Sequence, residues 1–90
     1  MELSDSLIQL LCRINDPEEM SSLFTEILTP HEQHNLSLRW KLMQALYEGK
    51  SQRQIASDLG ISLCKITRGS KIMKNPKSTS RKLLEININH

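Results

Sequence analysis

The sequence has 90 residues, of which 38% are hydrophobic and 24% charged, and its formal net charge is +2. A chain of this length forms one domain and buries only about 60–65% of its unfolded surface when it folds alone, so we expect a disulfide, a metal or a second chain to complete its core. No apolar run approaches the ~20 residues that span a bilayer, and the first ten residues lack the basic flank of a signal peptide. These features argue against the membrane and secreted classes and predict a cytoplasmic protein.

The charges are unevenly distributed along the chain. Residues 1–38 carry one basic and seven acidic side chains, whereas residues 39–90 carry eleven basic and three acidic ones. Such segregation is costly in self-repulsion unless the basic half faces a polyanion. The pattern therefore favours nucleic acid as a partner over a solvated basic tail. Aromatic residues make up only 3% of the chain, too few for the stacking platforms that bind single strands.

Capping residues and apolar stripes predict an all-α fold with six helices, over residues 5–14, 17–28, 30–48, 52–58, 62–73 and 79–88. Asp16 and Pro17 provide an N-cap and a proline at the first helical position of the second helix. Thr29 and Glu32 form a capping box at the start of the third. Gly49 is suited to end that helix, because glycine readily adopts the left-handed conformation of a C-terminal cap.

The third predicted helix is apolar on nearly all sides, through Leu36, Leu38, Trp40, Leu42, Met43, Ala45, Leu46 and Tyr47. Such a helix is buried all round, and a 90-residue monomer contains little protein to surround it. Cys12 and Cys64 form no CxxC pair and have no second pair to build a zinc site. A disulfide is also a less favoured remedy, because a cytosolic protein keeps its thiols reduced. We therefore expect a homodimer.

The stretch from Ser51 to Ser70 predicts a helix-turn-helix. Its elements are a capping pair, two short apolar faces, a small residue at a helix crossing and a glycine for a tight turn, namely Ser51, Gln54, Ile55, Ala56, Leu59, Gly60, Ile61 and Ile66. An ordinary helical hairpin would not need this combination at these offsets. In this interpretation the second helix enters the major groove of DNA. The predicted DNA-binding residues are Gln52, Arg53, Ser62, Leu63, Cys64, Lys65 and Thr67.

These elements divide the single domain of residues 1–90 into three parts. Residues 1–49 are expected to form the dimerisation core, residues 51–73 the helix-turn-helix, and residues 74–90 a basic linker and C-terminal helix. Specific strings lie within this frame: Leu28-Thr29-Pro30, Ser51-Gln52-Arg53, Leu59-Gly60 and Ile66-Thr67-Arg68-Gly69-Ser70. Over residues 26–73 they resemble the tryptophan repressor family of bacteria.

The resemblance implies an intertwined homodimer that takes L-tryptophan as corepressor and then binds operator double-stranded DNA, with no metal and no enzymatic activity. Arg39 and Arg68 match two arginines that sandwich the indole in this family, and the second also pairs with the ligand carboxylate. Gly69 matches a glycine that lets the ring approach the backbone. Leu28 and Thr29 of the other subunit match the turn whose carbonyls receive the ammonium group.

Three positions depart from the family pattern. Ile72 stands where the family has a serine that helps to hold the carboxylate. Glu26 replaces a leucine beside the ammonium site, and Met43 replaces a smaller apolar residue of the pocket wall. The departures leave open the affinity for tryptophan and the preference among indole compounds.

Two other functions compete with this interpretation. A helix-turn-helix protein that binds DNA without a ligand would not require Arg39 inside an apolar helix. A metalloenzyme built on His31, Glu32 and His34 would lack a third fixed ligand, because the start of a helix already accounts for the glutamate. The sequence shows no nucleophile beside a base and no glycine-rich phosphate loop, so we expect no catalysis.

Overall fold

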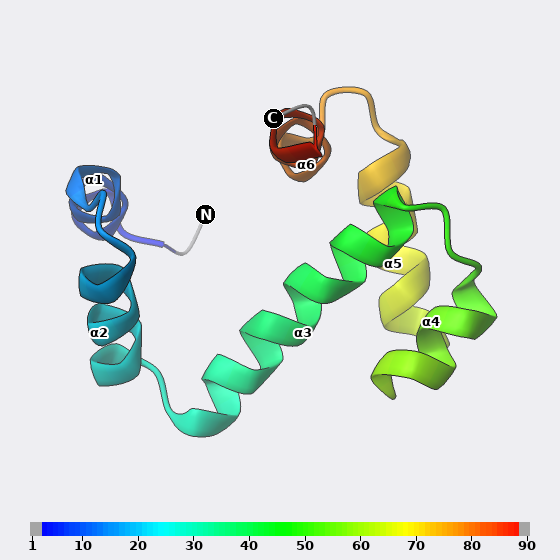
Figure 1. The fold of residues 1–90 in the computed structure, drawn as a ribbon, viewed down its shortest axis with the longest axis horizontal. Helices are drawn as coiled ribbons and strands as arrows, with labels where there is room; N and C mark the ends of the chain where they lie inside the picture. Colours follow the sequence, from blue (N-terminus) through cyan, green and yellow to red (C-terminus); the bar gives the residue numbers. More distant parts are fainter. Residues whose placement is uncertain (1–2, 89–90) are drawn as a thin grey trace. The chain divides into compact units, whose positions relative to one another are not determined.

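The computed structural model describes the backbone of residues 3–88 and the side chains of residues 3–86. The predicted domain covers residues 1–90, so its residues 1–2 and 89–90 lie outside the described part. The described residues form α-helices and no strand, which confirms the all-α prediction (Figure 1). In chain order the helices are α1 (Asp5–Arg13), α2 (Pro17–Ile27), α3 (Pro30–Tyr47), α4 (Gln52–Leu59), α5 (Leu63–Lys74) and α6 (Thr79–Ile88). Every predicted boundary lies within one residue of the observed one.

Each of these helices begins after a serine, threonine or aspartate whose side chain accepts a hydrogen bond from the backbone N–H three residues later. The capping residues are Ser4, Asp16, Thr29, Ser51, Ser62 and Ser78. Such a cap satisfies one of the free N–H groups of the first turn and contributes about 1 kcal/mol. The helix starts are therefore determined locally, which is why the capping residues predict them well.

The chain forms two compact units, residues 1–35 and residues 36–90, and α3 passes from one to the other. In the N-terminal unit, neither α1 nor α2 contains a buried residue. Leu10 and Ile27 are large apolar side chains of these helices that remain exposed. The described part of this unit therefore has no dry core of its own.

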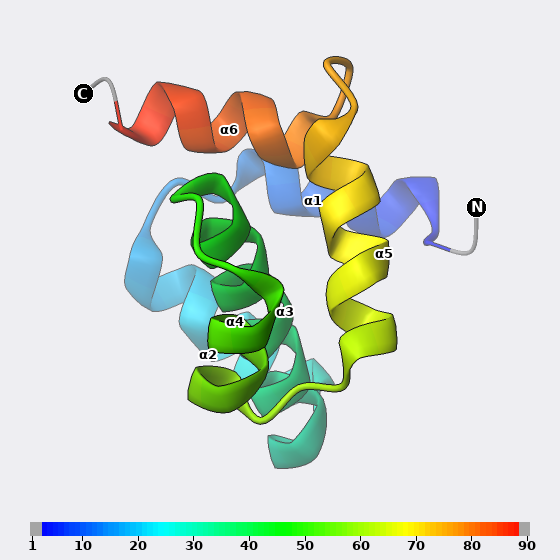
Figure 2. The same ribbon diagram turned by 90° about the vertical axis from the view of Figure 1, so that its right-hand side faces the viewer.

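The C-terminal unit has a small core shared by α3, α4 and α5. Leu42, Ala45, Ile55 and Ile66 are buried together, and the partly buried side chains around them are Leu46, Ala56, Leu59 and Ile61. In this unit α5 contacts both α4 and α6 (Figure 2). Burying each isoleucine stabilises the unit by about 1.5–3 kcal/mol, so this cluster fixes the arrangement of α4 and α5 on α3.

Two glycines with positive φ follow the C-terminal ends of α3 and α4. Gly49, at φ +85°, follows α3, and the N–H of Lys50 donates to the carbonyl of Ala45 at 3.1 Å. Gly60, at φ +63°, turns the chain from α4 towards α5. Other residues adopt this conformation only with strain, and both glycines lie where the sequence predicts a helix end or a tight turn.

The prediction that the third helix is buried on all sides is not met within one chain. Leu42 and Ala45 are its buried residues, whereas Leu36 and Trp40 retain 49% and 41% of their exposure. The apolar surface that remains is available to a second subunit. Its burial in a dimer stays a prediction.

Candidate nucleic-acid interface and ligand site

The helix-turn-helix predicted from the sequence corresponds to α4, the Gly60 turn and α5. Ser51 Oγ accepts from the N–H of Gln54 at 3.1 Å, and Ser62 Oγ accepts from the N–H of Lys65 at 3.4 Å. The capping box at Ser51 forms only in part, because the Gln54 amide donates to Asp58 Oδ1 at 2.8 Å. The two helices therefore start where the sequence places them, and α4 gains a bond along its own surface.

Two fully buried isoleucines hold this element against α3. Ile55 on α4 and Ile66 on α5 have no exposed surface, and both belong to the cluster that contains Leu42 and Ala45. Because both contacts involve rigid, β-branched side chains, they fix the crossing of α4 and α5. The start of α5 is consequently presented on a supported helix and not on a free loop.

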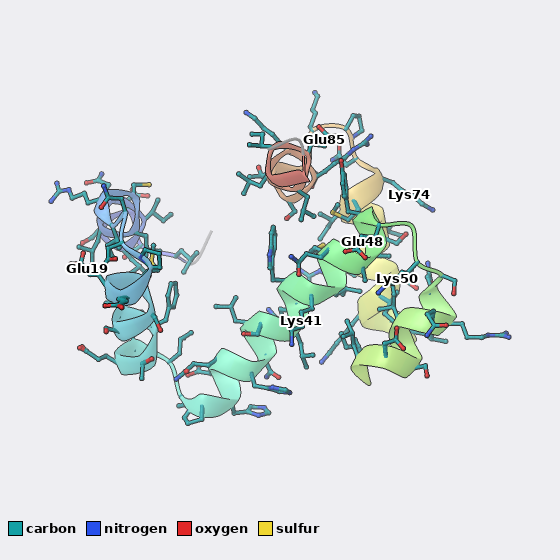
Figure 3. The ribbon with its side chains drawn as sticks, viewed as in Figure 1. Glu19, Lys41, Glu48, Lys50, Lys74 and Glu85 are labelled. Atoms are coloured by element: carbon teal, nitrogen blue, oxygen red, sulfur yellow. The ribbon has the colours of Figure 1, made fainter. Side chains whose placement is uncertain are left out.

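All seven side chains predicted to contact DNA are exposed: Gln52, Arg53, Ser62, Leu63, Cys64, Lys65 and Thr67. They lie at the N-terminal ends of α4 and α5. Further basic side chains of the same unit are also exposed, and Lys74 projects from α5 (Figure 3). Free N–H groups at helix starts and basic side chains are both suited to phosphates and base edges, so these exposed groups are consistent with the predicted interface.

Five of the seven predicted tryptophan-site residues belong to the C-terminal unit, on α3 and α5. Arg39 and Arg68 are exposed, Met43 is half-buried and Ile72 is 36% exposed. Arg39, Met43 and Leu46 follow one another at helical spacing and so share one face of α3. This is the face against which α5 packs, because Leu46 lies against Gly69.

Gly69 is buried where α5 packs against α3. A Cβ atom built on it would lie 3.1 Å from Leu46 Cδ1 and 3.2 Å from Leu42 Cδ2. Helix packing within one chain therefore already favours glycine here.

The other two predicted tryptophan-site residues, Leu28 and Thr29, form the turn that leads into α3. Glu32 Oε1 accepts from the N–H of Thr29 at 2.8 Å, and Thr29 Oγ1 accepts from the N–H of Glu32 at 3.1 Å. The backbone hydrogen bond from Thr29 is the main cause that lowers the pKa of the Glu32 carboxyl from 4.5. The predicted capping box is thus complete, and its two hydrogen bonds stabilise this turn.

Gln33, in the first turn of α3, supports this turn but was not predicted from the sequence. Its Nε2 donates to the carbonyl oxygen of Leu28 at 2.9 Å. A carbonyl oxygen has two lone pairs, so this bond orients the group and leaves one position for a second donor. No capping or periodicity rule links residues five positions apart, so no sequence signal identified the contact.

Two surface hollows of the C-terminal unit involve other residues. One, of about 210 Å³, lies between α3 and α4 near Lys41, Glu48 and Lys50 (Figure 3), with Lys50 Nζ 3.9 Å from Glu48 Oε2. The other, of about 400 Å³, is lined by α3, α5 and α6, including Lys74 and Arg81. Neither hollow is lined by a residue of the predicted tryptophan site.

The histidines at the start of α3 do not assemble a metal site. His31 Nε2 lies 3.2 Å from the Asn35 amide nitrogen, and Glu32 is engaged with Thr29. Within the described residues, no group of three histidine, cysteine, aspartate or glutamate side chains could hold a metal ion.

Cys12 and Cys64 are both free and exposed. None of the described helices has the length and apolar character that crossing a membrane requires.

Comparison with known proteins identifies the family. The sequence model of the family described as Trp repressor protein matches residues 2–87. The chain belongs to this family. The match covers the six helices apart from the last residue of α6, so the resemblance seen over residues 26–73 extends to nearly the whole chain. The Trp repressor family is a regulatory, DNA-binding one.

Curated relatives from three bacterial genera carry the name Trp operon repressor homolog. The relative from Vibrio campbellii is 32% identical over 80 residues, which cover 88% of this chain and 80% of the relative. That from Xylella fastidiosa strain M23 is 37% identical over 67 residues, 73% of each chain. That from Chlamydia trachomatis serovar L2 is 29% identical over 84 residues, 92% of this chain and 89% of the relative. No solved structure matches the chain.

Proposed function

We propose that this chain is a cytoplasmic, tryptophan-dependent transcriptional repressor. Two chains form a homodimer, L-tryptophan binds as corepressor, and the liganded dimer binds operator double-stranded DNA of tryptophan metabolism genes. The protein acts by binding and has no catalytic role. The observation that carries the proposal is the helix-turn-helix. The start of α5 is exposed, and the buried Ile55 and Ile66 hold the two helices against α3.

The case for DNA rests on charge as well as on shape. Between Gly60 and Lys82 the chain carries seven basic and no acidic residues, and α5 supplies four of them. If the dimer contacts a duplex at about six to eight phosphates, log affinity falls with log salt concentration at a slope of about −6. The same charges would gain little from a neutral partner.

The case for a dimer rests on apolar surface that a single chain leaves exposed. The N-terminal unit has no buried side chain on α1 or α2, and α3 exposes Leu36 and Trp40. Large apolar side chains left in contact with water are typical of a surface that a partner covers. In the proposed division, residues 1–49 form the dimer core, residues 51–73 read DNA, and residues 74–90 form a basic linker and C-terminal helix.

The case for tryptophan rests on Arg39 and Arg68, supported by membership of the family. A guanidinium can pair with a carboxylate in a bidentate manner and can stack on an aromatic ring. In this proposal both arginines face the indole, Arg68 also binds the carboxylate, and Met43, Gly69 and Ile72 line the site. The turn at Leu28 and Thr29 of the other subunit receives the ammonium group.

The proposal is tested by measuring DNA binding with and without tryptophan. The purified protein selects duplexes from a random pool, and fluorescence anisotropy then compares a selected duplex with a random one over a range of salt and tryptophan concentrations. We expect tryptophan to tighten binding to the selected duplex, and DNA to tighten tryptophan binding by the same factor, because both favour one arrangement.

Variants test whether Arg39 and Arg68 act through contacts with tryptophan or only through the net charge of the protein. Arg68→Ala should abolish the response to tryptophan, and Arg39→Ala should weaken tryptophan binding but leave weak non-specific DNA binding. Arg13→Ala, which removes an exposed arginine at the end of α1, is the matched control and should respond as the wild type does. DNA affinity that millimolar tryptophan leaves unchanged would favour the second candidate, a helix-turn-helix protein that binds DNA without a ligand.

A further inference from the structure

Leu63, the first residue of α5, is unusually exposed for its type. Its exposed fraction of 58% is the highest among the large apolar side chains of the described residues. It lies between the exposed, polar Ser62 and the exposed Cys64, with Lys65 two positions further along. The residue makes no contribution to the buried core, which at this end of α5 is supplied by Ile66.

The helical spacing of α5 gives this leucine a defined surface. At about 100° per residue, the buried Ile66 and Gly69 mark the side that faces the core. Leu63 and Thr67 lie only about 40° apart on one flank, and Lys65 lies about 160° from Thr67 on the other. The tip of α5 therefore presents one flank with apolar and methyl groups and another with an ammonium group.

We propose that Leu63 recognises the 5-methyl group of a thymine in the major groove. This inference rests on the proposed function, in which the N-terminal residues of α5 contact base edges. Among the four bases only thymine carries a methyl group in that groove, and apolar side chains contact it. An isobutyl group has no hydrogen bond to offer, so it cannot select a guanine, an adenine or a cytosine by their donors and acceptors. Lys65, by contrast, suits the acceptors of guanine.

The inference predicts that each half-site contains a thymine where Leu63 docks. Removing one buried methyl group should weaken binding about fourfold, equivalent to about 0.8 kcal/mol. Substitution in both half-sites of a symmetric duplex should weaken binding by roughly the square of that factor, because well-separated positions contribute additively.

The experiment replaces single thymines by deoxyuridine, which lacks the methyl group and keeps the base pair. The full-length protein, with saturating L-tryptophan, first selects duplexes from a random pool, and each thymine of a selected duplex is then replaced in turn. For the wild type we expect one thymine per half-site whose replacement weakens binding about fourfold. For Leu63→Ala we expect the thymine and deoxyuridine duplexes to bind equally, whereas Leu63→Met should restore the preference.

The thymine-to-deoxyuridine affinity ratio is the readout, because a general loss of folding or of affinity affects both duplexes equally. Lys65→Ala should bind more weakly but keep the ratio of the wild type, and it serves as the control. A wild-type protein insensitive to every replacement, or a ratio that persists in Leu63→Ala, would overturn the inference and leave the proposed function intact. Failure to select any duplex would overturn both.

Discussion

Replacing Gly69 by alanine tests whether the approach of α5 to α3 is as close as the structure shows. The new Cβ would meet Leu46 Cδ1 at 3.1 Å and Leu42 Cδ2 at 3.2 Å, so both leucine side chains must shift by a few tenths of an ångström. Overpacking of this kind costs about 1–3 kcal/mol, while alanine in a helix interior gains about 1 kcal/mol over glycine. We expect the free energy of unfolding to fall by about 1 kcal/mol.

Urea and thermal denaturation at a fixed protein concentration measure this loss, which corresponds to a decrease in Tm of about 4–8 °C for a domain of this size. A double-mutant cycle with Leu46→Ala isolates the contact. With the Cδ1 atom removed, Gly69→Ala should cost at least about 0.5 kcal/mol less than in the wild type. A Gly69→Ala protein that is more stable than the wild type, or a cycle without coupling, would refute the close approach.

Three further predictions concern the core, the turn and the ligand. Ile55→Ala should lower the free energy of unfolding in urea by about 2–5 kcal/mol. Leu83→Ala, at a 52% exposed position of α6 outside the proposed dimer core, should stay within about 0.5 kcal/mol of the wild type. A loss below about 1 kcal/mol for Ile55→Ala would contradict the complete burial of this side chain. The backbone hydrogen bond from Thr29 lowers the pKa of Glu32, so the ionised carboxylate stabilises the fold above pH 4.5 and this stabilisation is lost as the pH falls through the folded-state pKa. The Tm of Glu32→Gln should therefore fall less steeply with decreasing pH below 4.5 than the Tm of the wild type. Equal slopes of Tm against pH in the two proteins would contradict this. Calorimetry should show that Ile72→Ser binds tryptophan about fivefold more tightly than the wild type, because one regained hydrogen bond contributes about 1 kcal/mol. Ile72→Ala, which adds no donor, should show no such gain. Unchanged affinity of the serine variant would mean that the tryptophan carboxylate does not lie beside residue 72.

The helix boundaries were predictable because their causes are local. A capping side chain such as that of Ser62 bonds a backbone N–H only three residues away, and Gly60 adopts its positive φ at the position where the apolar stripe of α4 ends. Both signals lie within a few consecutive letters of the sequence. The same holds for the helix-turn-helix, whose core positions at Ile55 and Ile66 follow from spacing alone.

What escaped prediction depends on which groups meet in space. The amide of Gln54 could equally return to the start of α4, and only the structure shows that it bonds Asp58. The amide of Gln33 reaches the Leu28 carbonyl across the turn. The resemblance assigned Gly69 to the ligand, whereas the structure shows that a Cβ atom at this position would also meet two leucines of α3. The tryptophan site remains a prediction, because the proposed site draws on residues of two chains.

The buried cluster of the C-terminal unit has a consequence for how fast the protein folds. All four of its members lie between Leu42 and Ile66, so the core closes through short connections within consecutive helices. Chains rich in such near-neighbour contacts fold in microseconds to milliseconds, because little loop entropy is lost before the contacts form. We therefore expect this segment to collapse first, even while the chain is still being synthesised, and the earlier helices to find their place later, at a rate that depends on the encounter with a second chain.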